Sequence, residues 1–269
     1  MELDVLGHKT FCYTGGRPFE AGKPTLVFIH GVLNDHSGWI LQTRYFAHHG
    51  WSVLAPDLPG HCRSAGDPPT TVEQAADFLL ALLDAAGVAR AALIGHSFGS
   101  LAALEVAARA TDRVSQLVLV GTAFPMKVSP TLLEQSLNQP ELAMRLTNQF
   151  SHALMAPPPS ALGPGTWVAG STMALMRRVL ASNTRVNLFH TGYKAADSYA
   201  DGLAAMAQVR CPVCFILGEG DQMTPPRAAQ SLIGACTTAP RVVRVPGGHQ
   251  MMTEAPEETL AAMRGFLTP

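Results

Sequence analysis

Short apolar segments alternate with longer segments of helical periodicity along most of the chain. The apolar segments are typical of strands with both faces covered, as in a parallel sheet, and they are Thr25–Ile29, Ser52–Ala55, Ala91–Ile94, Gln116–Val120, Val213–Leu217 and Arg241–Val245. The helical segments are Gly38–His48, Val72–Ala86, Leu101–Ala110, Arg227–Gly234 and Glu257–Phe266. This alternation predicts an α/β fold in which helices cover both faces of a parallel sheet.

Two regions depart from the alternation. At the start, Glu2–Gly7 and Lys9–Tyr13 are typical of an antiparallel hairpin at the edge of the sheet. Between about residues 125 and 199 the pattern is helical and is broken by prolines, including the run Pro157–Pro159. We therefore expect a core domain made of residues 1–124 and 200–269, with residues 125–199 inserted as a helical unit.

The composition narrows the set of partners. The 269 residues are 47% hydrophobic and 14% charged, with a formal net charge of −1 at pH 7. So small a net charge would attract neither nucleic acid nor an anionic membrane, and we expect neither as a partner. The low charged fraction indicates extensive buried surface and leaves room for an apolar pocket or a homodimer interface. No apolar segment reaches the roughly 18 residues that span a bilayer, and Met1–Val5 has no export-signal character, so we expect a cytoplasmic protein.

The five cysteines do not form the even set of a secreted disulfide framework. Cys211 and Cys214 form a C-x-x-C motif, but Cys214 falls inside a predicted strand. A thiol buried in a strand lacks the helix N-terminus that activates redox cysteines, and no second pair completes a zinc site. We therefore expect buried free thiols and no metal.

The most informative motif is Gly95-His96-Ser97-Phe98-Gly99, a G-x-S-x-G sequence between an apolar segment and an alanine-rich helical segment. A serine at a sharp strand-to-helix turn requires strained backbone and very small neighbours. Gly95 and Gly99 meet this requirement, and the turn would hold the Ser97 hydroxyl open to a substrate. Ser97 is therefore the candidate nucleophile, and we expect His96 to pack beneath the pocket.

A serine hydroxyl needs a base within hydrogen-bond reach and an acid that orients this base. Two later loops follow predicted strands, one with Glu219 and Asp221 and the other with His249. Because the carboxyl ends of parallel strands meet at one edge of a sheet, both loops should converge on Ser97. We identify His249 as the candidate base and Asp221 as the candidate acid, with Glu219 as the alternative acid.

Serine chemistry also needs donors that stabilise a tetrahedral oxyanion. For this turn type, one backbone N–H comes from the residue after the nucleophile and another from a loop after an earlier strand. Here these are the N–H groups of Phe98 and Val32. His30 precedes Val32 by two positions and either shapes the loop or contacts substrate.

These residues, together with Asp57–Ser64, resemble the α/β-hydrolase fold superfamily, and the similarity extends over nearly the whole chain. The resemblance implies an eight-stranded, mostly parallel sheet, with residues 125–199 as a helical cap over the active site. It implies no metal and no organic cofactor. In the family a glycine usually stands where this chain has Cys62. We therefore expect that the backbone of this loop has a conformation that a residue other than glycine can adopt.

The nucleophile narrows the reaction that the resemblance implies. Relatives that open epoxides or displace halide generally carry aspartate as the nucleophile at this strand-to-helix turn, which is called the elbow. The serine at position 97 therefore disfavours both reactions. We expect a carboxylic ester hydrolase that acts through an acyl-enzyme on a small or medium, largely apolar ester. The candidate substrate-binding residues are His30, Met144, Phe150, Trp167, Leu175 and Met176.

Other readings use the same scaffold. The same triad supports C–C bond hydrolysis of a vinylogous diketone, thioester cleavage and cofactor-free perhydrolysis. Cationic side chains that could meet an acidic substrate are present in the insertion, although a solvated helix face is the simpler role for each of them: Arg145, Arg177, Arg178 and Arg185. A different class is a ligand sensor, in which slow turnover accompanies a cap rearrangement that recruits a partner.

Overall fold

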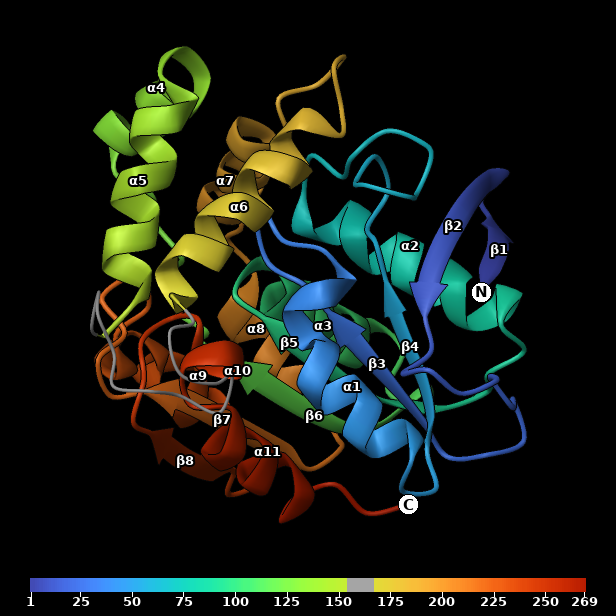
Figure 1. Ribbon diagram of the computed structural model, residues 1–269. Helices are drawn as coiled ribbons and strands as arrows, with labels where there is room; N and C mark the ends of the chain where they lie inside the picture. Colours follow the sequence, from blue (N-terminus) through green and yellow to red (C-terminus); the bar gives the residue numbers. More distant parts are fainter. Residues whose placement is uncertain (154–166) are drawn as a thin grey trace.

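The computed structural model describes residues 1–153 and 167–269 of the chain, and these ranges contain a single eight-stranded sheet (Figure 1). The strands lie in the order β1-β2-β4-β3-β5-β6-β7-β8. Their bounds are β1 Glu2–Val5, β2 His8–Tyr13, β3 Thr25–Ile29, β4 Ser52–Pro56, β5 Ala91–His96, β6 Val114–Val120, β7 Val213–Gly218 and β8 Arg241–Val245. From β4 to β8 every pairing is parallel, whereas β2 pairs antiparallel with both β1 and β4. The predicted sheet and leading hairpin are confirmed.

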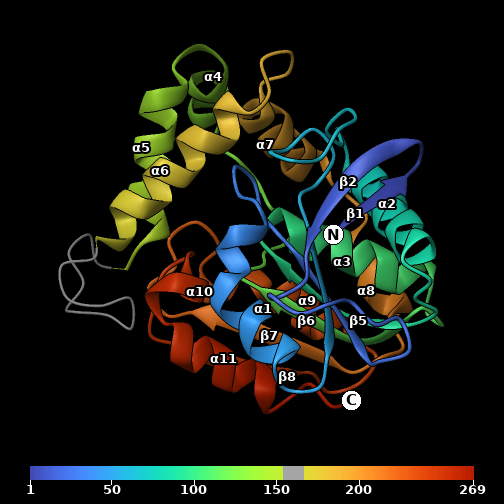
Figure 2. The ribbon, with the colours of Figure 1, turned by 45° about the vertical axis from the view of Figure 1, so that its right-hand side comes forward.

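The central strands are buried on both faces because successive side chains point to opposite sides. Val27 and Leu93 belong to one apolar cluster, and their neighbours Phe28 and Ile94 belong to another. The first cluster packs under α2 Val72–Ala85, α3 Phe98–Arg109, α8 Gly202–Gln208 and α9 Gln230–Ala235. The second packs under α1 Ile40–Ala47, α10 Met251–Glu254 and α11 Pro256–Arg264, and Figures 1 and 2 show α1 and α11 on the opposite side of the sheet from α3 and α8.

Helix boundaries follow from local capping chemistry. Thr71 precedes α2, and its hydroxyl accepts a hydrogen bond from the N–H of Gln74 at 3.2 Å, which satisfies one free donor of the first turn. The helix α3 begins at Phe98, three residues before the predicted start, because the turn at Ser97 leads straight into it. The short helices α8 and α10 were not predicted, since seven and four residues are too few to show a helical period.

Four helices connect β6 to α8 and lie across the carboxyl ends of the parallel strands (Figures 1 and 2). They are α4 Pro130–Asn138, α5 Pro140–Ser151, α6 Val168–Ala181 and α7 Leu188–Ser198. Their facing sides form a separate apolar cluster that includes Met144, Met173, Phe189 and, from the core, Leu33. The limits of this unit at residues 125 and 199 stay a prediction, and residues 154–166, with Pro157–Pro159, lie outside the described residues.

Two further expectations concern the membrane and the cysteines. In the described ranges, none of the helices has both the length and the apolar character that crossing a bilayer requires. All five cysteines are free, and Cys211 and Cys214 are both buried. Burial raises the pKa of the Cys214 thiol to about 12, so the C-x-x-C motif has the unreactive thiols that its strand position predicted.

Candidate active site

Ser97 occupies the turn between β5 and α3 with a φ of 54° and a ψ of −122°, a strained conformation for a side chain with a Cβ atom. The flanking glycines make this turn sterically feasible. A Cβ atom on Gly95 would collide with the Gly99 carbonyl, and one on Gly99 would lie 2.5 Å from the Ile29 carbonyl oxygen. The G-x-S-x-G spacing is therefore a packing requirement of the strand-to-helix turn.

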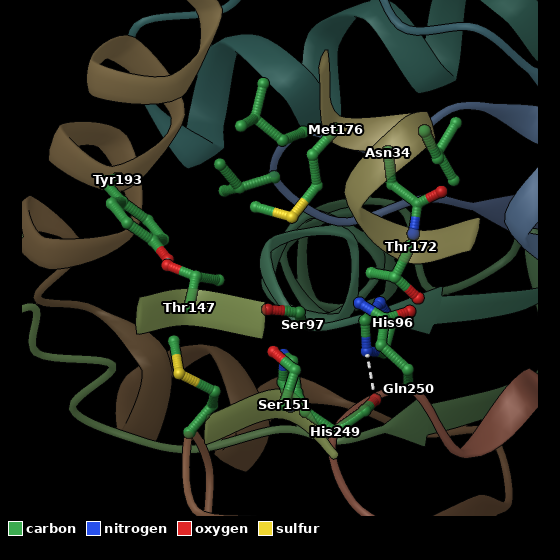
Figure 3. A pocket seen from close by; sticks show the side chains of 14 residues that line it. Asn34, His96, Ser97, Thr147, Ser151, Thr172, Met176, Tyr193, His249 and Gln250 are labelled. Carbon is green, nitrogen blue, oxygen red and sulfur yellow. Dashed lines mark hydrogen bonds between the residues drawn. The ribbon is translucent and has the colours of Figure 1, made fainter. Parts of the chain in front are cut away.

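Ser97 lines a small pocket at the point where the strand order reverses. Chain order runs outward from β3 to β4 and then returns to β5 on the other side of β3, which opens a crevice between the ends of β3 and β5. The cavity measures about 40 Å³. Its walls, shown in Figure 3, are Val32, Leu33, Asn34, His96, Ser97, Thr147, Ser151, Thr172, Leu175, Met176, Tyr193, Met223, His249 and Gln250.

The loops after β7 and β8 bring Asp221 and His249 together. The Nδ1 atom of His249 lies 2.9 Å from Asp221 Oδ2, and both side chains are buried. The Thr224 hydroxyl lies 2.8 Å from the same carboxylate oxygen, while the N–H groups of Met223 and Thr224 donate to Oδ1 at 2.9 and 2.8 Å. This network fixes the carboxylate and directs the other imidazole nitrogen, Nε2, away from it.

The charge state of Asp221 is set by opposing effects. Burial disfavours the ionised form, but the facing His249 imidazole and the hydrogen bonds from His249 and Thr224 favour it more strongly. The net result is a pKa for Asp221 below its ordinary value. An ionised carboxylate at this position can stabilise an imidazolium on His249. Glu219, the alternative acid, has no hydrogen bond to His249 among the described residues, so the geometry favours Asp221.

Ser97 and His249 share the pocket, but no hydrogen bond joins their side chains in the described part of the chain. Catalytic hydrogen bonds are often long before substrate binds and tighten in the complex.

His96 holds the loop after β8 in place, since its Nε2 lies 2.9 Å from the His249 carbonyl oxygen and the two rings are 4.6 Å apart. Burial lowers the pKa of His96 to about 3, so this imidazole is neutral. His96 therefore lies beside His249, in the pocket wall and not beneath the pocket.

The two backbone donors expected at an oxyanion site both lack a hydrogen-bond partner among the described residues. Phe98 is the first residue of α3, so its N–H has no partner within the helix. The N–H of Val32, in the loop after β3, also donates to no acceptor in the described part of the chain. Gly31 keeps this loop close to the elbow, because a Cβ atom there would lie 3.0 Å from the Ser97 Cβ. The loop after β3 and the turn after β5 thus meet at Ser97.

Of the six candidate substrate-binding residues, Leu175 and Met176 line the pocket and the other four do not. His30 is buried, with Nδ1 2.9 Å from the Gly31 carbonyl and Nε2 accepting from the Leu58 N–H at 3.0 Å, so it shapes the loop. Met144 packs inside the cluster between the cap helices. Phe150 and Trp167 are 42% and 60% exposed. The helical pattern of the insertion indicates where apolar residues recur, but it does not distinguish a packed face, an exposed position and the pocket wall.

Hydroxyl and amide side chains in the pocket wall were missed by the sequence analysis: Asn34, Thr147, Ser151, Thr172, Tyr193 and Gln250. Polar residues on a helix usually face solvent, and nothing in their spacing indicated otherwise. Thr224 was also missed, although a residue three positions after an aspartate often donates to it in a local turn. Only five of the fourteen lining residues are apolar, namely Val32, Leu33, Leu175, Met176 and Met223.

The four arginines of the insertion all pair with carboxylates elsewhere, and no arginine or lysine of its described part lines the pocket. Arg178 lies 2.6 Å from Asp35, and Arg185 lies 3.3 Å from Asp67. Both aspartates belong to loops of the core. Arg145 and Arg177 both pair with Glu141 on the surface of the helical insertion.

One cluster outside the pocket has metal-ligand residue types, Asp35, His36 and Asp57. Its carboxylates already accept hydrogen bonds from the protein, since Asp57 lies 2.7 Å from His36 Nδ1 and Asp35 accepts from Arg178 and Ser37. These bonds account for the cluster as a loop scaffold. The nearby Cys62 has a φ of 45°, so this position keeps the left-handed backbone that glycine favours and that a residue with a Cβ atom adopts only uncommonly.

Comparison with known proteins gives a consistent result. A profile of the alpha/beta hydrolase fold matches residues 24–256. Lipase LipV from Mycobacterium tuberculosis is 37% identical over 105 residues, which are 38% of this chain and 39% of the lipase. A putative carbamate hydrolase, RutD, from Klebsiella pneumoniae is 28% identical over 236 residues, 85% of each chain. The crystal structure of the enol-lactonase from Burkholderia xenovorans superposes with a TM-score of 0.80 at 22% identity, covering 100% of both chains. The chain spans 26–39% of the length of the first three curated relatives that it matches.

Proposed function

Because this chain belongs to the α/β-hydrolase fold family, as its motifs predicted, we propose that it is a serine hydrolase that cleaves carboxylic esters. The observation that carries the proposal is the buried Asp221–His249 pair, whose imidazole lines the same small pocket as Ser97. The family and its lipase relative support the broader part of this proposal, hydrolase activity.

In the proposed mechanism, the Ser97 Oγ attacks the ester carbonyl carbon while Nε2 of His249 takes the hydroxyl proton. The carbonyl oxygen becomes an oxyanion that accepts hydrogen bonds from the unpaired N–H groups of Val32 and Phe98. Asp221 stabilises the imidazolium that forms on His249. The imidazolium then protonates the departing alcohol, which leaves an acyl group on Ser97.

Water completes the cycle by the same steps. His249 accepts a proton from a water molecule that attacks the acyl carbonyl, and it returns this proton to Ser97 as the acid product leaves. The strained turn keeps Ser97 in one position throughout, so the proton transfers need only a small adjustment of the His249 ring.

The helical unit at 125–199 is proposed to act as the cap that selects substrates. Its arginines pair with Glu141, Asp35 and Asp67, so no cation of the described cap faces Ser97 to bind an acidic substrate. This arrangement weighs against a C–C hydrolase or thioesterase that recognises its substrate by a carboxylate or phosphate. An uncharged ester is the substrate class that the pocket wall fits best.

Turnover of 4-nitrophenyl acetate and 4-nitrophenyl butyrate tests this proposal, with Ser97→Ala as the matched control. We expect both esters to be hydrolysed by the wild-type protein and neither above background by the variant. A 4-nitrophenyl carbamate belongs in the same panel, since the same attack would cleave it. Equal rates for wild type and Ser97→Ala on every ester would contradict the proposal, and turnover far below that of ordinary enzymes with ligand-dependent partner capture would favour a sensor.

A further inference from the structure

The pocket above Ser97 is small, and the imidazoles of His96 and His249 are the only basic side chains among the described residues that line it. Its volume of about 40 Å³ corresponds to roughly three water molecules, since each needs about 10–15 Å³ by this measure. None of its lining residues is lysine, arginine, aspartate or glutamate. The undescribed segment 154–166 also contains no charged residue in its sequence, so it cannot supply one.

Three cap helices direct hydroxyl groups into this space. Thr147 and Ser151 come from α5, Thr172 from α6 and Tyr193 from α7, and Figure 3 shows them surrounding Ser97. Most of these hydroxyls already have partners. Thr147 Oγ1 lies 2.7 Å from the Tyr193 hydroxyl, and Thr172 Oγ1 lies 3.2 Å from the Val168 carbonyl oxygen.

Ser151 is the exception. Its side chain is only 1% exposed, and its Oγ is buried with no hydrogen-bond partner among the described residues. A buried hydroxyl without a partner costs about 1–3 kcal/mol, so natural structures rarely keep one that has no use. In Figure 3 the Ser151 hydroxyl is turned toward the Ser97 side of the pocket.

The backbone holds Ser151 beside the base. Ser151 is the last residue of α5, and its carbonyl accepts a hydrogen bond at 3.1 Å from the N–H of Gln250, the residue after His249. Gly248 permits this approach, since a Cβ atom there would lie 2.5 Å from the Ser151 carbonyl oxygen. The free hydroxyl is therefore fixed relative to the site of bond cleavage.

We propose that the pocket selects a short acyl group that carries an uncharged oxygen, such as an ether or hydroxyl, close to the ester carbonyl, and that Ser151 donates a hydrogen bond to this oxygen. This inference rests on the proposed esterase function and names the substrate class of the same site. An apolar acyl group of equal size fits the same space but leaves the Ser151 hydroxyl unpaired. A site built to pair with a polar group rejects the apolar analogue for this reason.

A pair of isosteric esters isolates the effect. 4-Nitrophenyl methoxyacetate differs from 4-nitrophenyl butyrate by an oxygen in place of one methylene, so size and leaving group are matched. We expect Ser151→Ala to lower the ratio of kcat/KM for methoxyacetate to that for butyrate by roughly tenfold. The ratio within one protein variant is compared with the ratio in another, so the intrinsic reactivity of the two esters cancels.

Ser136→Ala is the control, since Ser136 is also a buried cap serine but its hydroxyl donates to the Leu133 carbonyl at 2.7 Å and does not line the pocket. This control should keep the wild-type ratio. Ser151→Ala should also unfold at a temperature no lower than wild type, because it removes an unpaired polar group.

The outcomes separate the two proposals. Turnover of both esters with an unchanged ratio in Ser151→Ala would overturn the role of Ser151 and leave the esterase proposal standing. An equal fall for both esters together with a lower unfolding temperature would assign Ser151 a structural role and also overturn it. Failure of the wild-type protein to hydrolyse either ester would overturn the esterase function and this inference with it.

Discussion

The two walls of the pocket are held in place by different forces. On the core side, Ser97 stands in strained backbone between two glycines, and His249 is buried and hydrogen-bonded to Asp221 at the ends of neighbouring strands. On the cap side, the lining residues project from helices that meet the core at separate points. Two of these points are the Arg178–Asp35 ion pair and the hydrogen bond between the Gln250 N–H and the Ser151 carbonyl.

This difference separates the chemistry from the choice of substrate. Groups that transfer a proton must stay within about 0.5 Å of their productive positions, which strands packed on both faces can guarantee. A wall that only selects substrate needs shape and hydrogen-bond partners, which a helix can change one residue at a time. Core variants should therefore slow all esters alike, while cap variants should change relative rates or stability.

His249→Ala should have the largest effect. Without the imidazole no group accepts the Ser97 proton, so kcat should fall about 10⁴-fold or more, for acetate and butyrate esters equally. Steady-state kinetics measure this fall, with His48→Ala, an exposed histidine, as the control that keeps wild-type rates. A large loss of kcat for only one of the two esters would contradict the division of roles, in which the core performs the reaction and the cap selects the substrate.

Asp221→Asn should lower kcat by about 10⁴-fold, because an amide cannot supply the negative charge that stabilises the His249 imidazolium. Circular dichroism should show an intact fold. Glu219→Gln, in the same loop, should stay within about twofold of wild type. The reverse pattern, with Glu219→Gln slow and Asp221→Asn active, would move the acid to Glu219.

Much of the core side could be predicted from the sequence because its constraints are local. A buried parallel strand needs a continuous apolar segment, and loops that follow parallel strands meet at one edge of the sheet. The turn at Ser97 has room only for glycine at positions 95 and 99. These rules gave the strands to within two or three residues at each end, and they placed Asp221 beside His249.

The cap side could not be predicted in the same way. Leu175 and Met176 line the pocket, but Phe150 and Trp167, which have similar chemistry, are largely exposed. A helical period identifies an apolar face, and only the packing of α5 against α6 and α7 decides what that face meets. Polar lining residues such as Ser151 carry no periodic signal at all.

Mild acid should destabilise the core. Burial lowers the pKa of His96 to about 3 and that of His61 to about 4, so both stay neutral in the folded protein while they take up protons in the unfolded chain below about pH 6.5. The unfolded state then binds more protons, and stability falls as pH falls, by up to about 1.4 kcal/mol per pH unit for each histidine.

Urea unfolding at pH 7.0 and 5.0 measures this slope. His61→Gln should reduce the slope, whereas His8→Gln, at an exposed position, should leave it unchanged. Equal stability of the wild-type protein at the two pH values would contradict the burial of His96 and His61 as neutral imidazoles.

Arg178→Ala should have the smallest effect. It removes the ion pair with the buried Asp35, but the arginine is 58% exposed and Asp35 keeps its hydrogen bonds from Ser37, so the loss of stability should be about 1 kcal/mol. Arg145→Ala, which breaks an exposed pair within the cap, should cost less than about 0.5 kcal/mol. Thermal unfolding compares the stabilities of the two variants. A larger loss of stability for Arg145→Ala would show that the Arg178–Asp35 ion pair does not hold the cap to the core.

Covalent labelling identifies the attacking atom without any assumption about the substrate. The wild-type protein is incubated with a fluorophosphonate, its intact mass is measured, and the modified peptide is sequenced by mass spectrometry. We expect one adduct per chain, on Ser97, and none in Ser97→Ala. A stoichiometric adduct on another residue, or one that persists in Ser97→Ala, would contradict it.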